Sequence, residues 1–200
     1  LAPTLPEIAD EFGMTVGGVG QLRTVASVAG VVAALALAPA ARRVPVRSLL
    51  RGGLALLAGG ALVSGVAPSF AVLALGQLVI GVGVAAVLSS GLAAANDWSD
   101  DESRSRVLAW TIVGQPASWV VGLPIIGALS NLGWRWGWGV VPAAALLAAV
   151  ALPCAPKSRR TVLRPRDTWR AWRDRRTRRW AFGELMAYAG WGGTLVYAGA

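Results

Sequence analysis

Five long intervals of the sequence are almost free of Asp, Glu, Lys and Arg, and they constrain the fold more than any other feature. A helix rises 1.5 Å per residue, so about 20 apolar residues cross the roughly 30 Å hydrocarbon core of a bilayer. Intervals of this length therefore predict transmembrane helices. They cover residues 24–41, 52–96, 107–134 and 136–156. The fifth interval runs from residue 180 onward and contains one charged residue, Glu184.

The interval 52–96 is too long for one crossing. As a single helix its 45 residues would reach about 68 Å, more than twice the thickness of the core. Proline cannot continue a helix interior, so Pro68-Ser69 is the expected hinge between two spans. The sequence thus predicts an all-α, polytopic transmembrane helix bundle whose complete spans lie near 24–41, 50–67, 70–95, 107–129 and 136–153.

The composition supports a membrane location and excludes most catalytic chemistry. Hydrophobic residues make up 55% of the chain and charged residues 14%, whereas about a quarter of a soluble domain is charged. The sequence has no histidine and one cysteine, Cys154, which excludes disulfide scaffolds, imidazole metal sites and Ser-His-Asp or Cys-His catalysis. No paired carboxylates share a span interior. We therefore expect no enzymatic activity, no metal and no cofactor.

The charged connections give the orientation, because Lys and Arg in short loops stay on the cytoplasmic side of a membrane. The cytoplasmic connections are the loop with Arg42, Arg43, Arg47 and Arg51, then residues 97–106 and 157–179. The outer ones are the opening segment with Glu7, Asp10 and Glu11, the hinge at 68–69 and residues 130–135. This alternation predicts a multi-pass protein of the cell (inner) membrane.

The cytoplasmic segment 157–179 carries the net charge of the molecule. It holds eleven Lys or Arg residues against Asp167 and Asp174, and this balance of +9 equals that of the whole chain. The pI of 11.5 therefore reflects one segment and not a basic surface that binds nucleic acid. Trp169 and Trp172 lie among its arginines, so we expect it to lie on the anionic inner leaflet as an anchor rather than a regulatory element.

The predicted orientation implies further spans beyond this sequence. The first complete span starts outside, so an earlier span is expected before it, and the chain begins with Leu1 rather than Met. A long basic cytoplasmic loop between six spans and a seventh is the layout of a two-halved transporter. We expect a piece of such a protein, divided into 1–19 (end of span one and outer loop), 20–153 (amino-terminal bundle), 154–179 (basic central loop) and 180–200 (start of span seven).

The span near 107–129 holds the most specific motif. Gly114-Gln115-Pro116 precedes the run GLPIIG from Gly122 to Gly127, and Gly133-Trp134-Arg135 follows at the outer end. This pattern resembles the major facilitator superfamily, in particular the arabinose and chloramphenicol efflux permeases of its drug:proton antiporter branch. Leu5-Pro6-Glu7-Ile8-Ala9 resembles the opening of the same family. The resemblance implies secondary active efflux of a drug-like or sugar-like molecule by alternating access of two six-helix halves, coupled to protons.

Small residues give this span a smooth face. Gly114, Ser118 and Gly122 recur every four residues, so we expect a neighbouring helix to approach them closely. Pro116 and Pro124 loosen the backbone hydrogen bonding, which permits a bend while one half rocks against the other. Small residues also pack helices in unrelated membrane proteins, so the gating interpretation depends on the resemblance.

Two family positions are altered. The family loop Gly-x-Leu-Ala-Asp-Arg-x-Gly-Arg-Arg braces the inner gate, and here Arg42 replaces its acid and Pro45 its second glycine. The usual ion pair is therefore not expected, although Arg43 and Arg47 can still hold the orientation. Gln77 stands where many proton-coupled members place an arginine four residues before a glycine. A neutral amide can hydrogen-bond a substrate or a neighbouring helix, but it cannot tune a carboxylate.

The entry to the span near 107–129 leaves two interpretations open. Glu102-Ser103-Arg104 resembles the acidic-acidic-Arg entry of the family, in which Arg104 would make a gating contact. Acidic residues at a helix amino terminus also stabilise it electrostatically, which makes local capping an equal alternative.

Polar side chains inside a membrane are candidates for function, because an unpaired charge there is energetically costly. The candidates for the substrate cavity are Arg23, Gln77, Gln115, Trp119 and Glu184. Arg23 and Glu184 lie near span ends and could instead reach the interface, and Trp119 could instead face lipid. An uptake permease of the same fold, or a membrane signalling or assembly protein without a substrate, would share these features.

Overall fold

The computed structural model describes residues 4–40, 44–152, 173–184 and 186, which form helices and, over these ranges, no strand. The helices are α1 (Leu5–Phe12), α2 (Val16–Ala40), α3 (Val46–Gly65), α4 (Phe70–Trp98), α5 (Arg104–Ser130), α6 (Trp134–Gly137) and α7 (Val140–Ala151). A further helical stretch covers 175–184. The predicted all-α fold is confirmed.

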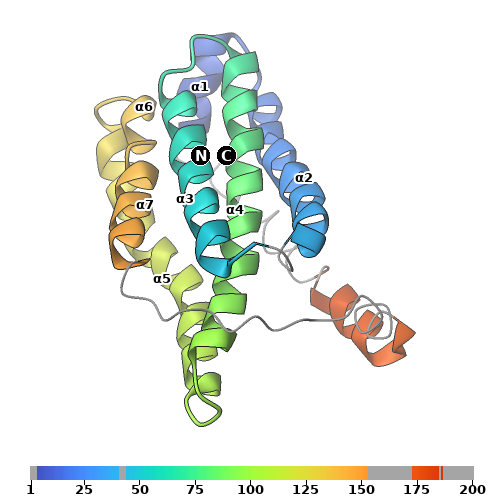
Figure 1. Cartoon of the computed structure of the whole chain (residues 1–200). Helices are drawn as coiled ribbons and strands as arrows, with labels where there is room; N and C mark the ends of the chain where they lie inside the picture. The colour runs from blue at the N-terminus through green and yellow to red at the C-terminus, as the bar shows by residue number, and fades with distance from the viewer. Residues whose placement is uncertain (1–3, 41–43, 153–172, 185, 187–200) are drawn as a thin grey trace.

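Helix α4 is the central element of the bundle (Figure 1). It packs chiefly against α3 and α2, while α7 packs against α3. Helix α1 lies at one end of the bundle, beside the turn between α3 and α4. We call this end, which also holds α6, the outer end, in line with the orientation expected from the charges. The inner end holds the connection between α4 and α5.

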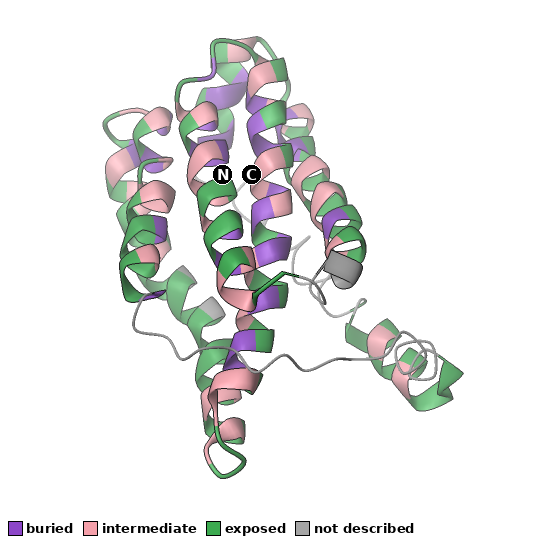
Figure 2. Ribbon diagram, viewed as in Figure 1, coloured by how far each residue is buried: buried purple, intermediate pink, exposed green. Residues whose placement is uncertain are grey.

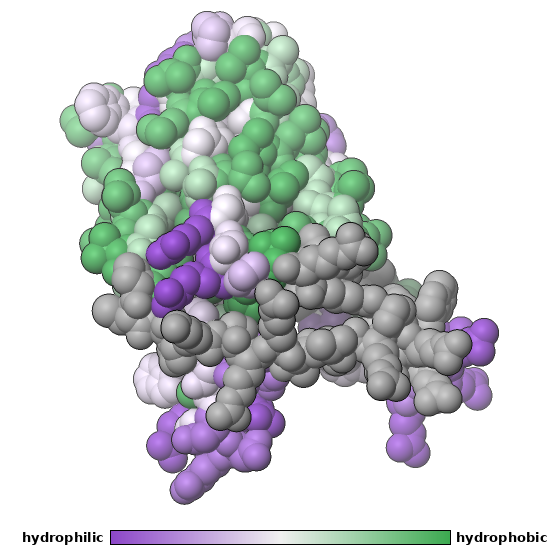
Figure 3. Space-filling view, in the orientation of Figure 1, coloured by the Kyte–Doolittle hydropathy of each residue, from purple (hydrophilic) through white to green (hydrophobic). Residues whose placement is uncertain are grey.

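Among the described residues, four helices are long and apolar enough to cross a membrane, namely Val16–Leu37 of α2 together with α3, α4 and α5. Buried residues concentrate along the centre of the bundle, above all on α4 (Figure 2). The outward surfaces carry large apolar side chains, such as Leu35 at 73% and Val120 at 76% exposure. Figure 3 shows apolar side chains over the body of the bundle and hydrophilic ones gathered toward the inner end. Such a surface fits a bilayer, because so large an apolar area is rarely left in water.

Glycines bring α4 close to both of its neighbours. A Cβ added at Gly81 would overlap the backbone of Ala26 on α2. A Cβ added at Gly60 of α3 would lie 2.9 Å from the carbonyl oxygen of Gly76 on α4. Small residues let helix backbones approach in this way, and in lipid such packing drives helix association. The centre of the bundle is therefore held by backbone contact more than by large side chains.

The turn between α3 and α4 contains Pro68 and Ser69, where the hinge was expected. The Ser69 Oγ accepts a hydrogen bond from the backbone nitrogen of Val72 at 3.4 Å. This bond satisfies one of the free N–H groups at the start of α4. The turn therefore ends one span and starts the next within a few residues.

The stretch 136–153 is not the continuous helix that the sequence predicted. Helix α6 ends at Gly137, and α7 occupies only Val140–Ala151. Gly137, Gly139 and Pro142 lower the helix propensity at this point, and a hydropathy pattern does not register that effect. With 12 residues, α7 reaches about 18 Å and is not among the four candidate spans.

Helix α2 begins earlier than the predicted 24–41, at Val16. Gly13 has a φ of 62°, a left-handed conformation that ends α1 and turns the chain toward α2. Arg23 consequently lies inside α2. A single charge ends an apolar run in the sequence, but it does not end a helix.

Candidate functional site

Some of the predicted site residues lie outside the part of the chain that the structure describes. These are Arg42, Arg43, and the side chains of Gln115 and Trp119. Most of segment 157–179 and the residues beyond Met186 are outside it as well. Arg23 on α2 and Glu184 in the stretch 175–184 are described, and both are exposed.

None of the motif residues of α5 is buried within the described part of the chain. They are Gly114, Pro116, Ser118, Gly122, Pro124 and Gly127. The helix continues without a break through both prolines. A Cβ added at any of the three glycines would have no atom within 4 Å. The expected close approach of another helix is therefore not made by the residues described here, because α5 packs chiefly on its chain neighbours α4 and α6.

Gln77 is buried between α4 and α3 and binds the neighbouring helix. It is 3% exposed, and its Nε2 donates a hydrogen bond to the Ser64 Oγ at 3.1 Å. The Ser64 hydroxyl donates in turn to the carbonyl oxygen of Gly60 at 2.8 Å. Of the two roles expected for the amide, contact with a substrate or with a helix, this geometry supports the second.

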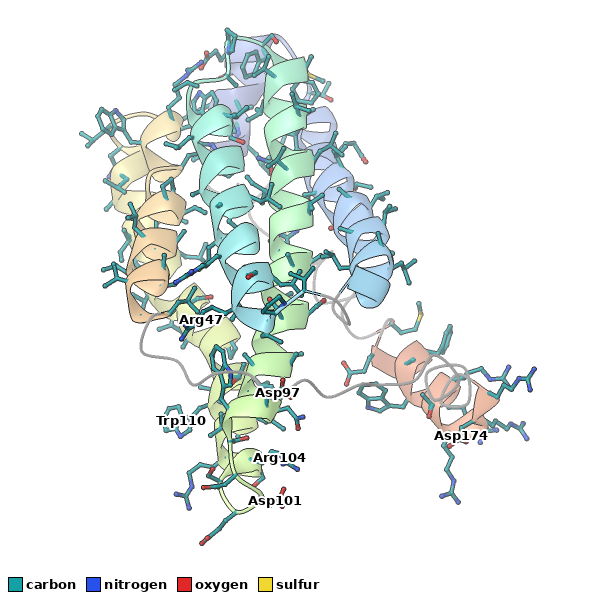
Figure 4. The ribbon with its side chains drawn as sticks, viewed as in Figure 1. Arg47, Asp97, Asp101, Arg104, Trp110 and Asp174 are labelled. Carbon is teal, nitrogen blue, oxygen red and sulfur yellow. The ribbon has the colours of Figure 1, made fainter. Side chains whose placement is uncertain are left out.

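The inner end joins α4 to α5 through an acidic turn. Asp100 Oδ1 accepts hydrogen bonds from the Ser103 backbone nitrogen at 2.8 Å and from Ser103 Oγ at 2.5 Å, and these bonds lower the pKa of the Asp100 carboxyl. Arg104 Nη2 pairs with Asp101 Oδ1 at 2.7 Å. Figure 4 shows Asp101 and Arg104 at the tip of this connection, with Arg47 of α3 at the same end of the bundle. Both contacts lie within the turn that leads into α5, so they favour a local role at the helix start over a gating contact, although the side chain of the N-cap residue Ser103 makes no capping hydrogen bond.

Three parts of the outer end are linked through the pair of Arg135 and Glu11, whose carboxylate lies in the last turn of α1. Arg135 Nη2 and Nη1 donate to its two oxygens at 2.6 and 2.7 Å, in a two-pronged charge-assisted pair. Trp134 Nε1 donates to the same carboxylate at 2.6 Å. Arg135 Nη2 also donates to the carbonyl oxygen of Ala67, in the turn between α3 and α4, at 3.1 Å. We call Glu11, Trp134 and Arg135 the outer clamp.

Gly133 and aromatic packing place Trp134 for these bonds. Gly133 has a φ of 118°, which L side chains rarely adopt, and it turns the chain into α6. The Trp134 ring packs edge-on against Phe12 with 6.2 Å between centroids, and Phe12 packs in the same way on Phe70 of α4 at 6.4 Å. The guanidinium carbon of Arg135 lies 4.4 Å from the Trp134 ring centroid. The clamp thus rests on an aromatic cluster shared by α1, α4 and α6.

The outer clamp keeps both of its charges. Hydrogen bonds from Arg135 and Trp134 lower the pKa of Glu11, and the bond to Glu11 raises the pKa of Arg135. The stabilisation from a carboxylate with a lowered pKa is complete at neutral pH and is lost only as the pH falls through that lowered value. Solvent screens the pair, because both side chains are more than one third exposed. Glu11 is therefore unsuited to exchange protons near neutral pH.

The sequence identified only part of this arrangement. Gly133-Trp134-Arg135 was recognisable as a motif, whereas Glu11 was one of three acids in the opening segment. Glu11 and Arg135 are 124 residues apart, so no helical or strand spacing links them. Within the described residues, no three His, Cys, Asp or Glu side chains form a group that could hold a metal ion.

Comparison with known proteins gives the family. The chain matches the model of the Major Facilitator Superfamily over residues 1–200. It is 32% identical over 164 residues to the chloramphenicol resistance protein of Streptomyces lividans, a match that covers 81% of this chain and 42% of that protein. It is 24% identical over 149 residues to the uncharacterized MFS-type transporter YbcL of Bacillus subtilis (strain 168), with 74% and 38% covered. The chain thus spans about two fifths of the length of these curated relatives. Because the family model matches the whole sequence, the chain belongs to the major facilitator superfamily of membrane transporters.

Proposed function

We propose that this chain forms most of the amino-terminal half of an exporter, which moves a small molecule across the cell membrane by alternating access and uses a proton gradient. Family membership makes the chain part of a transporter and not of an enzyme. The observation that carries export is the 32% identity to a protein named for chloramphenicol resistance. Proton coupling is supported by the resemblance of the α5 motif to the drug:proton antiporter branch.

The open face of α5 supports a second bundle that packs against this one. Gly114, Ser118 and Gly122 form a smooth stripe, and no described atom lies within 4 Å of a Cβ added at either glycine. A second bundle could approach this stripe closely, and alternating access is the rocking of one bundle against the other around a midplane site. Pro116 and Pro124 free backbone carbonyls in α5, which lets the helix bend. We propose that this stripe is the moving contact between the halves.

Four predicted side chains remain candidates for the substrate path, namely Arg23, Gln115, Trp119 and Glu184. The exposure of Arg23 on α2 supports its candidacy, because an arginine in a span rarely faces lipid and more often faces an interior or a water-filled cavity. Gln77 is better placed to hold α3 against α4 than to meet a substrate, since it is buried between them.

The arginine-rich segment 157–179 is proposed to lie on the anionic inner leaflet. Its described part presents five exposed arginines between 173 and 179, followed by Trp180 at 68% and Phe182 at 63% exposure. Each basic residue near an anionic leaflet contributes about 1 kcal/mol of attraction, and aromatic rings favour the headgroup region. These residues support an anchor on the inner face of the cell membrane.

Export is tested with the complete protein in cells that lack other drug exporters, with radiolabelled chloramphenicol as the probe. We expect these cells to accumulate severalfold less chloramphenicol than cells with an empty vector, and we expect a protonophore to abolish the difference. Higher accumulation would favour an uptake permease of the same fold. Equal, gradient-independent accumulation of chloramphenicol and of a panel of other drugs would contradict the proposal.

A further inference from the structure

The outer clamp joins parts of the chain that lie far apart in the sequence. Glu11 belongs to α1 and Arg135 to α6, and Ala67 lies in the turn between α3 and α4. One carboxylate binds two side chains of one connection, and one guanidinium reaches a third connection. Loss of the Glu11–Arg135 pair would therefore remove the polar link from α1 through Arg135 to Ala67, while the apolar contacts of α1 would remain.

Helix α1 packs on the outer end of the bundle. Its described residues are Leu5–Phe12. Its buried side chains join an apolar cluster at the outer end, whose buried members are Leu5, Ile8, Ala9, Val19, Leu22, Ala67, Leu73 and Trp134. Apolar contact is non-directional, whereas the two-pronged bond of Glu11 has a fixed geometry. The clamp therefore sets the angle at which α1 sits on the bundle.

Arg135 selects one of three acids on α1. Glu7 lies one helical turn before Glu11, Asp10 directly precedes it, and all three are exposed. The arginine Arg23 follows later in the sequence and lies on α2, not on α1. The hydrogen bonds from Arg135 and Trp134 both go to Glu11. Glu7 thus provides a matched comparison, with the same side chain on the same helix and outside the clamp.

We propose that Glu11, Trp134 and Arg135 are positioning residues, which make α1, the α3–α4 turn and α6 one rigid outer unit that moves as a body when the carrier opens. This inference rests on the alternating access proposed above. Rocking of a bundle transmits motion to its outer end only if the connections there do not shift separately. When the clamp is broken, each connection moves alone, and less of the rocking opens or closes the outer side.

Hydrogen exchange on the purified complete carrier in lipid nanodiscs tests whether the three connections behave as one unit. We expect Glu11→Gln to speed exchange about three- to tenfold in α1, at 66–70 and at 131–139 together, because the Arg135 guanidinium that also binds Ala67 loses its charged anchor on α1. Glu7→Gln should leave all three unchanged. The double variant Glu11→Arg with Arg135→Glu should restore part of the protection in α1 and at 131–139 but not at 66–70, because a carboxylate at position 135 cannot donate to the Ala67 carbonyl oxygen. Faster exchange confined to α1, or an equal effect of Glu7→Gln, would overturn the proposal.

Transport of radiolabelled chloramphenicol by the same variants in proteoliposomes separates positioning from substrate contact. Glu11→Gln should lower the maximal rate about fivefold and leave the half-saturating concentration unchanged, and the double variant should recover part of the rate. A raised half-saturating concentration at an unchanged maximal rate would contradict a positioning role. A wild-type carrier that moves no chloramphenicol would count against the proposed function, while the exchange experiment would still decide whether the clamp is one unit.

Discussion

Adding one methyl group at Gly81, as in Gly81→Ala, is expected to destabilise the complete carrier by about 3 kcal/mol or more. The new Cβ would overlap the carbonyl oxygen of Ala26 and lie 2.9 Å from its carbonyl carbon and 3.1 Å from its Cα. These are backbone atoms of α2, so no side-chain rotation relieves the overlap. Helix α4 would have to move away from α2, and the contact between Gly30 and Gly81 would open as well.

Gly91→Ala is the matched control for this prediction, because Gly91 lies on the same helix and a Cβ there would meet no atom within 4 Å. Alanine is favoured over glycine in a helix by about 1 kcal/mol, so Gly91→Ala should be neutral or slightly stabilising. Thermal unfolding of the detergent-purified carrier, followed by tryptophan fluorescence, compares the two variants. Equal midpoints for Gly81→Ala and Gly91→Ala would show that α4 and α2 are not in backbone contact.

A bulky side chain on the open stripe of α5 is expected to slow transport strongly while the described bundle still folds. In the variant Gly122→Phe, the phenylalanine ring would extend from a position where an added Cβ meets no described atom within 4 Å. The described bundle can therefore accommodate the ring. The proposed second bundle could then no longer approach the helix closely. We expect the rate of chloramphenicol transport in proteoliposomes to fall more than about tenfold, because the rocking step would be blocked. Purified protein should still elute as a single species.

Val120→Phe is the control for the stripe. Val120 is 76% exposed and lies on the far side of α5 from Gly122, because two residues rotate a helix by about 200°. A phenylalanine facing lipid at this position should leave transport near the wild-type rate. Full transport by Gly122→Phe, or equal losses in the two variants, would mean that the stripe is not the moving contact.

The fold class could be predicted from the sequence because hydrocarbon leaves a spanning backbone few choices. An uncharged run of 20 residues or more must satisfy its N–H and C=O groups internally, and a helix does so. The same signal failed at 136–153, since an apolar composition does not show where Gly137 and Gly139 interrupt a helix. It also misplaced the start of α2, because Arg23 interrupts the apolar run and not the helix.

The candidate site was less predictable, because its contacts join distant positions. The sequence singled out Gln77, but its partner Ser64 is a small polar residue within an apolar run and follows no recognisable spacing. It singled out Arg135 within a motif, but its partner Glu11 depends on how α1 folds back over the outer end. The α5 stripe could be recognised by its spacing, whereas its open environment depends on which helices surround it.

Proton-driven transport by the purified complete carrier in liposomes tests the central claim most directly. Chloramphenicol is a suitable probe because it is uncharged near neutral pH, so a pH gradient alone does not concentrate it. An exporter that exchanges drug for protons should accumulate radiolabelled chloramphenicol in liposomes with an acidic interior, and a protonophore should release it. We expect this accumulation with the carrier and not in protein-free liposomes. A distribution that is the same with and without the carrier, and unaffected by the gradient, would contradict the claim.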